Sequence, residues 1–206
     1  DLEDQMKHFL AIADLTPAEF NQLLVVAKKL KAEWRARGNQ PVLKNKTLGM
    51  IFQKPSLRTR VSFDMAMLHL GGQALYLSPN EISLGQRESI ADVSRVLSRY
   101  VDGIMARVFA HAHVTELAQY SGVPVINGLT NEFHPTQILA DFMTMIEHAR
   151  KPLTNISFCY TGDARFNMGN SYLEGAALMG MDLRIAAPKA YCPSESDQGE
   201  RKDPHA

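Results

Sequence analysis

The chain has 206 residues, which is enough for one large domain or one and a half ordinary ones and for a sizeable buried core. Its 22 Lys and Arg residues balance 22 Asp and Glu residues, so the charge predicts neither a broad nucleic-acid surface nor an anionic-membrane surface. No run of 18 apolar residues occurs, and residues 1–4 lack the basic and apolar regions of a secretory signal. We therefore expect a soluble, cytoplasmic protein whose anionic ligands, if any, are small and bound locally.

The clearest predicted element is a helix near the start of the chain. Thr16, Pro17 and Glu19 form a capping box with Pro at the first helical position. One apolar face follows, made of Phe20, Leu23, Leu24, Ala27 and Leu30. Beyond it, predicted strands at 47–52, 73–78, 103–108 and 123–126 alternate with predicted helices at 57–70, 89–100 and 113–121. This alternation predicts an α/β fold with a parallel sheet and helices on both faces.

Unusual polar residues stand at the carboxyl ends of these strands. Residues 56–60, Ser-Leu-Arg-Thr-Arg, fall at a junction of strand and helix, where first-turn N–H groups, the helix dipole and bidentate arginine favour a phosphate. Arg107 ends a second strand, and residues 134–137 follow a third. Because ligands bind at the carboxyl ends of parallel strands, we expect the three segments to form one anion pocket. The competing interpretation is a solvated helix start and an ordinary surface or core histidine.

A second α/β segment begins after residue 150. A helix at 136–148 is followed by a strand at 155–160, a helix at 167–179 and a strand at 182–187, which is one βαβ unit. Residues 194–206 contain no aromatic residue and no aliphatic residue larger than Ala, so this tail is expected to be disordered. The organisation predicted is a domain at 1–149, an incomplete one at 150–193 and the tail.

The two cysteines have no metal-ligand spacing. Cys159 lies inside the apolar run 156–160, so we expect a buried strand thiol. No metal site is expected from either cysteine.

Several ordered motifs resemble one enzyme family. Residues 56–63 resemble the carbamoyl-phosphate signature of the aspartate and ornithine carbamoyltransferases, in which many members have Thr where this chain has Leu57. Residues 134–137, His-Pro-Thr-Gln, resemble the second family motif, and residues 162–171 resemble the ornithine branch. The resemblance implies that 1–149 binds carbamoyl phosphate and that 150–193 begins an ornithine-binding domain. Later family segments, Asp-Ser-Met-Gly and His-Cys-Leu-Pro, do not occur, so we expect a C-terminally truncated chain.

The resemblance also implies a reaction and roles for residues. The reaction is transfer of the carbamoyl group of carbamoyl phosphate to the δ-amine of ornithine, giving citrulline and phosphate in arginine metabolism, with no metal or organic cofactor. The implied carbamoyl-phosphate ligands are Ser56, Leu57, Arg58, Thr59, Arg60, Arg107, His134 and Gln137. Arg107 and His134 would donate to the oxygen that gains negative charge, and Gln137 would orient the amide nitrogen. Asn167 would contact ornithine, with a helix N-cap as its alternative role.

In the family, a loop in the 80s reaches the active site of a neighbouring subunit. Ser83 stands where a Gln or His is usual and is shorter, so Gln86 or Arg87 is a candidate to replace that contact. A crossing loop implies a homotrimer or a multiple of trimers. Two alternatives stay open: a carbamoyltransferase for another amine, such as putrescine or acetylornithine, and a non-catalytic carbamoyl-phosphate-binding or assembly module. Whether the 206-residue chain is active also stays open.

Overall fold

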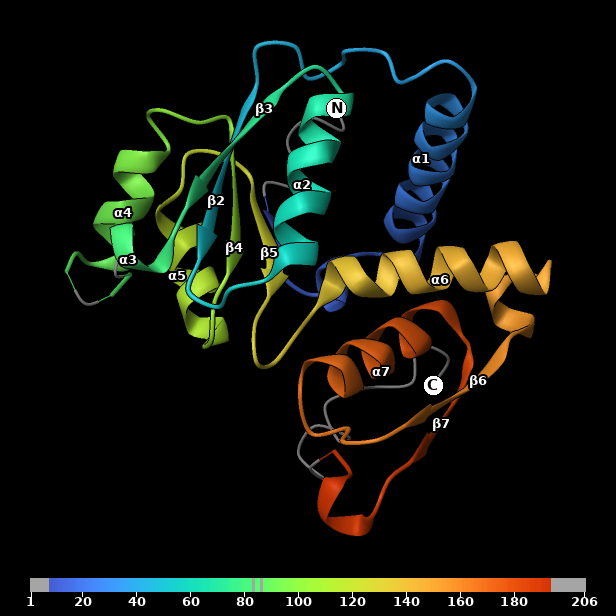
Figure 1. Ribbon diagram of the computed structural model, residues 1–206. Coiled ribbons are helices and arrows are strands. Elements are labelled where there is room, and N and C mark those ends of the chain that lie inside the picture. Colours follow the sequence, from blue (N-terminus) through green and yellow to red (C-terminus); the bar gives the residue numbers. More distant parts are fainter. Residues whose placement is uncertain (1–7, 83, 86, 194–206) are drawn as a thin grey trace. The chain divides into compact units, whose positions relative to one another are not determined.

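The structure is a computed structural model that describes residues 8–82, 84–85 and 87–193. The predicted cross-subunit residues Ser83 and Gln86 and the tail at 194–206 lie outside these residues. The contacts divide the chain into two compact units (Figure 1). The first unit contains residues 1–10 and 26–130, and the second unit contains residues 11–25 and 131–206. No helix in the described ranges is both long and apolar enough to cross a membrane.

The first unit is built on a parallel sheet, as predicted, and the sheet has five strands where the sequence predicted four. The strands are β1 (His8–Phe9), β2 (Thr47–Phe52), β3 (Gln73–Leu77), β4 (Gly103–Arg107) and β5 (Val125–Leu129), in the order β1-β5-β4-β2-β3. The helices are α2 (Leu57–His69), α3 (Pro79–Ile82), α4 (Ile90–Leu97) and α5 (His111–Tyr120). The sequence did not predict β1 or α3, which are two and four residues long.

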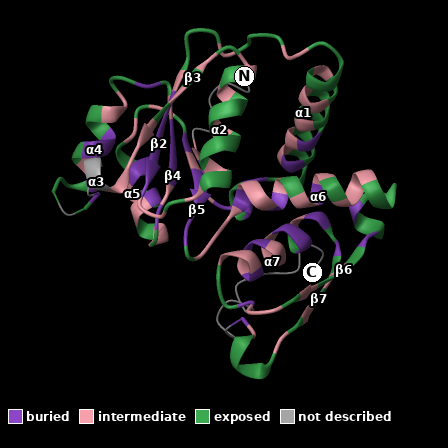
Figure 2. Ribbon diagram, viewed as in Figure 1, coloured by how far each residue is buried: buried purple, intermediate pink, exposed green. Residues whose placement is uncertain are grey.

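Helices cover both faces of this sheet, which confirms the predicted α/β class. On one face Val93 of α4 and Leu117 of α5 pack with Ile104 of β4. On the other face Phe63 of α2 packs against a smaller cluster that includes Met50 of β2. Figure 2 shows the buried residues concentrated in the central strands, which is expected because a parallel sheet is covered on both sides.

The helix predicted from the capping box is α1 (Pro17–Ala36). The Thr16 N–H donates to Glu19 Oε2 at 2.7 Å, and the Glu19 N–H donates to Thr16 Oγ1 at 3.2 Å. Both halves of the capping box are therefore formed. Phe20, on the predicted apolar face, is fully buried and packs edge-on against Phe142 with ring centroids 5.7 Å apart.

The second unit holds the predicted βαβ segment. Its elements are α6 (Pro135–Ala149), β6 (Ser157–Thr161), α7 (Asn167–Met179) and β7 (Asp182–Ala186), with β6 and β7 parallel. Short 3-10 turns lie at Ile12–Asp14, Leu153–Asn155 and Lys189–Tyr191. A Cβ atom added to Gly175 of α7 would lie 2.8 Å from Ile138 Cγ2 and 3.0 Å from Phe142. Glycine at this position therefore allows α7 to approach α6 closely.

The predicted burial of Cys159 is wrong, because this side chain is exposed. Side chains alternate along β6: Phe158 and Tyr160 are half-buried and their rings contact Tyr172 of α7, whereas Ser157, Cys159 and Thr161 are exposed. An apolar run predicts cover on both faces of a strand. In the described part of the second unit, α7 covers the Phe158 face, and Cys159 points from the other.

Candidate functional site

The first part of the site is the start of α2. Ser56 is the N-cap residue, with extended backbone angles, and its Oγ accepts a hydrogen bond from the Thr59 N–H at 3.3 Å. The same hydroxyl donates to Thr59 Oγ1 at 3.1 Å. Because the first-turn N–H groups of a helix have no intrahelical acceptors, this turn favours an anion. The Leu57 side chain is 78% exposed, so its backbone N–H is the group suited to such a contact.

The second part is the carboxyl end of β4, which lies beside the end of β2. Phe52 and Arg107 are paired in the ladder, and the Arg107 carbonyl accepts from the N–H groups of Gln53 at 2.9 Å and Lys54 at 3.4 Å. The Arg107 guanidinium donates from Nη1 to Thr59 Oγ1 at 3.2 Å. The structure thus brings together two of the three segments predicted to form one pocket.

The electrostatics of Arg107 suit an anion at this point. Its pKa is held below its usual value, first by burial and second by the positive charge of Arg58. Its Nε is buried and has no hydrogen-bond partner among the described residues. A phosphate dianion would reduce the repulsion between the two guanidiniums and would give the buried N–H an acceptor. Arginine can donate two hydrogen bonds to such a phosphate.

Arg60 makes a different contact. Its guanidinium lies over the ring of Tyr76 on β3, 4.0 Å from the ring centroid, in a cation–π arrangement. The contacts that join Ser56, Thr59 and Arg107 do not include it. This geometry fits a residue that anchors α2 to the sheet.

Sequence reasoning missed Gln53, which organises the loops around Arg107. Its Oε1 accepts from the Phe109 N–H at 3.2 Å and contacts His113 Nδ1 at 3.3 Å, and its Nε2 donates to the Leu84 carbonyl at 3.3 Å. The available signal was an amide side chain directly after an apolar strand. The residue ties the loops after β2 and β4 together.

His134 and Gln137, the third predicted segment, lie at the start of α6 in the second unit. His134 occupies the N-cap position, its N–H donates to the buried Ser171 Oγ at 2.8 Å, and Pro135 follows at the first helical position. Gln137 donates from Nε2 to Asp141 Oδ1 at 3.0 Å. Both residues thus sit on one helix start, while Arg107 and residues 56–60 belong to the first unit.

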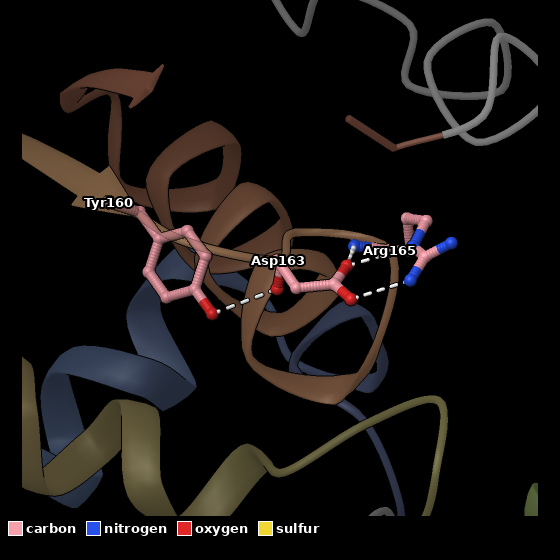
Figure 3. Close-up of polar contacts among 3 residues, drawn as sticks. All are labelled: Tyr160, Asp163 and Arg165. Carbon is pink, nitrogen blue, oxygen red and sulfur yellow. Dashed lines mark hydrogen bonds and ion pairs between the residues drawn. The ribbon is translucent and has the colours of Figure 1, made fainter. Parts of the chain in front are cut away.

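Asn167 is the first residue of α7, and the preceding loop is held by an ion pair. The N-cap residue of α7 is Phe166, so Asn167 does not have the N-cap role that was its alternative. Figure 3 shows Asp163 with Arg165, whose Nη2 and Nε donate to its two carboxylate oxygens at 2.7 and 2.9 Å. The guanidinium holds the pKa of Asp163 below its usual range. Tyr160 donates to the Asp163 carbonyl at 3.0 Å, which fixes the loop from its other side.

A family model and solved structures resemble this chain. The model for the aspartate/ornithine carbamoyltransferase carbamoyl-P binding domain matches residues 7–147. Ornithine carbamoyltransferase from Pyrococcus furiosus is 44% identical with a TM-score of 0.91, over 95% of this chain and 62% of that one. The enzyme from Thermus thermophilus is 41% identical with a TM-score of 0.87, over 95% and 66%. An anabolic ornithine carbamoyltransferase from Campylobacter jejuni is 40% identical with a TM-score of 0.86, over 94% and 62%.

The chain spans less than two thirds of the length of these three structures. The matched family segment includes the whole α2 start, Arg107, His134 and Gln137 and covers well over half of the chain. The chain therefore belongs to the aspartate/ornithine carbamoyltransferase family.

Proposed function

We propose that the protein transfers the carbamoyl group of carbamoyl phosphate to the δ-amine of ornithine, giving citrulline and phosphate in arginine metabolism. The single observation that carries this proposal is the contact of Arg107 with Thr59, beside Arg58 and with a buried Nε left for a ligand. The similarity to structures named ornithine carbamoyltransferase supports ornithine as the amine.

In the proposed ground state, the phosphate lies at the start of α2. Ser56, Arg58, Thr59 and the backbone N–H of Leu57 bind its oxygens, because hydroxyls, a guanidinium and first-turn N–H groups all donate. Arg107 contacts both the phosphate and the carbonyl oxygen. Arg60 stabilises α2 through Tyr76 rather than through the ligand.

In the proposed reaction, the neutral δ-amine attacks the carbamoyl carbon. A C–N bond forms and negative charge gathers on the carbonyl oxygen. The bond from carbon to the phosphate oxygen then breaks, and the amine gives a proton to the departing phosphate. Arg107 and His134 stabilise the oxygen by donating hydrogen bonds to it, which is the interaction that grows toward the transition state. Gln137 accepts from the carbamoyl NH2 group. This route uses no metal or organic cofactor.

We also propose a role for each of two parts of the sequence. Residues 1–149 bind carbamoyl phosphate, and residues 150–193 supply part of the ornithine site, with Asn167 at its edge. The position of Asn167 at the start of α7, after a loop fixed by Asp163 and Arg165, supports that placement.

The proposed assembly is a cytoplasmic homotrimer or a multiple of trimers. Helix α2 supports it, because none of its 13 residues is buried. Four apolar side chains at intervals of four, four and three residues are exposed: Leu57, Val61, Met65 and Leu68. A stripe of this kind on one helix face is suited to a second copy of the chain. The cross-subunit role of Ser83 and Gln86 is part of this proposal.

The test has two steps on the full 206-residue chain. Calorimetry with carbamoyl phosphate measures binding, and transfer of a labelled carbamoyl group to ornithine, putrescine and acetylornithine measures reaction. Labelled citrulline supports the proposal, and preferential transfer to another amine overturns the assignment to ornithine. Binding without transfer to any amine supports the binding-module alternative, and absence of binding refutes the carbamoyl-phosphate site.

A further inference from the structure

A hydrogen-bonded chain of three side chains links α6 and α7 behind Gln137. Gln137 Nε2 donates to Asp141 Oδ1 at 3.0 Å, and the Tyr172 hydroxyl donates to Asp141 Oδ2 at 2.6 Å. All three side chains are partly buried and belong to the second unit. Among the residues that the structure describes, each carboxylate oxygen of Asp141 therefore accepts from one donor, and the two donors come from different helices.

The carboxylate of Asp141 determines which end of the Gln137 amide faces it. An ionised carboxylate only accepts hydrogen bonds, so the amide must turn its NH2 group toward Asp141. The carbonyl oxygen of Gln137 is then the end directed elsewhere. A flipped amide would offer a donor, which cannot pair with the NH2 group of a carbamoyl ligand.

Tyr172 is suited to hold Asp141 in that role. Gln137 and Asp141 stand one turn apart on α6, so their bond alone leaves both free to change rotamer together. Tyr172 adds a fixed point from α7, and its ring is held by Phe158 at 5.6 Å and Tyr160 at 5.5 Å between centroids. Burial and the hydrogen bond to Asp141 raise the pKa of Tyr172, so its hydroxyl stays protonated as a donor.

We propose that Tyr172 is a positioning residue that acts through Asp141 to present the Gln137 carbonyl oxygen to the amide group of carbamoyl phosphate. This rests on the proposed function, because it takes Gln137 as the partner of the carbamoyl NH2 group. The simpler reading is a bond that only joins α6 to α7. The two differ in one consequence. Only if Tyr172 positions Gln137 does the effect of Tyr172→Phe on affinity depend on whether the ligand carries an NH2 group.

Two phosphonates separate these readings. Phosphonoacetamide carries a carboxamide, and acetonylphosphonate carries a methyl group in place of the NH2 group. Tyr172→Phe removes one hydroxyl and keeps the ring. Calorimetry is expected to show about three- to tenfold weaker binding of phosphonoacetamide, the size of one lost hydrogen bond, and acetonylphosphonate affinity within about twofold of wild type.

Tyr160→Phe is the matched control, because it removes a hydroxyl from the neighbouring ring that bonds the Asp163 carbonyl instead. It is expected to leave both affinities unchanged. Asp141→Asn is the second variant, since its amide accepts and donates and so no longer fixes Gln137; it should weaken phosphonoacetamide selectively. In a Gln137→Leu background, Tyr172→Phe should add nothing. Equal weakening of both ligands, no weakening, or additivity with Gln137→Leu would overturn the proposal.

A second measurement separates this proposal from the proposed function. If the wild-type chain binds neither phosphonate, the proposed carbamoyl-phosphate site is wrong. The NMR resonances of the Gln137 side-chain amide then show whether Tyr172 still determines the orientation of Gln137. Tyr172→Phe is expected to shift them and Tyr160→Phe to leave them in place. Unchanged resonances in Tyr172→Phe would overturn the positioning role by itself.

Discussion

Replacing Arg107 should weaken anion binding and leave the free energy of unfolding almost unchanged. Arg107→Met keeps the length of the side chain and removes the guanidinium that reaches Thr59 Oγ1 at 3.2 Å. Truncating one partner of a hydrogen-bonded charge pair costs about 2–5 kcal/mol, and the half-buried position of Arg107 favours the lower part of that range. A loss of about 2–3 kcal/mol corresponds to roughly thirty- to 150-fold weaker binding of carbamoyl phosphate.

The free energy of unfolding of the ligand-free chain should change little in the same variant. Losing the bond to Thr59 costs about 0.5–1.5 kcal/mol, and removing a buried donor without an acceptor returns about 1–3 kcal/mol. Relief of the repulsion from Arg58 acts in the same stabilising direction. Urea unfolding should therefore place Arg107→Met within about 1 kcal/mol of wild type or slightly above it.

Arg60→Met is the matched control, since Arg60 contacts Tyr76 and not Thr59. Its affinity for carbamoyl phosphate should stay within about twofold of wild type, while it loses up to about 1 kcal/mol of stability. Normal binding by Arg107→Met, or an equal loss of affinity in both variants, would refute an anion site at Arg107.

Three further predictions concern assembly, packing and pH. Met65→Lys places a charge on the exposed stripe of α2 and should lower the molar mass seen by light scattering from a trimer to a monomer; an unchanged trimer would contradict the assembly surface. Gly169→Ala should lose about 1–3 kcal/mol in urea unfolding, because its Cβ would overlap the Ala164 backbone, whereas Gly122→Ala, with its nearest atom at 3.9 Å, should not. Lys46 and the Thr47 N–H lower the pKa of Asp102 below 3.8, so Asp102 stabilises the fold above that value and loses this effect as the pH falls through its folded pKa. Asp102→Asn should therefore unfold at lower urea than wild type at neutral pH, and this difference should vanish at low pH.

Periodicity predicted most of the first unit because its elements have clear local signals. The apolar spacing of Phe63 and Met67 placed a helix at 57–70, and the structure has it at Leu57–His69. The sequence predicted a strand at 123–126, whereas β5 extends over Val125–Leu129. The prediction ended too early because Asn127 and Gly128 are residue types typical of turns. Tertiary contacts overrode that signal: Asn127 Nδ2 donates to the Leu10 carbonyl at 2.8 Å.

The elements and burial that the sequence did not predict depend on partners distant in the chain. β1 is two residues long, which is too short for any periodicity, and it exists because it pairs with β5. Cys159 lies in a strand as predicted, but its exposure depends on which face α7 covers. A sequence pattern reports that a strand is apolar and not what lies against each side of it.

The candidate site likewise contains residues that the sequence could place and residues that it could not. The α2 start and Arg107 could be placed together because a helix start and a strand end meet at the same edge of a parallel sheet. The bond between Tyr172 and Asp141 joins residues 31 positions apart, and the sequence predicted no role for either residue. Contacts of this kind depend on how two helices pack and carry no local signal.

A competition between carbamoyl phosphate and inorganic phosphate for the wild-type chain distinguishes a carbamoyl-phosphate site from a general phosphate site. Both ligands offer the α2 start a phosphate, and only carbamoyl phosphate offers Arg107, His134 and Gln137 a carbamoyl group. Calorimetry is predicted to show saturable binding of one carbamoyl phosphate per chain, tighter than that of phosphate. Equal affinity for the two, or no binding of either, would refute the proposed carbamoyl-phosphate site.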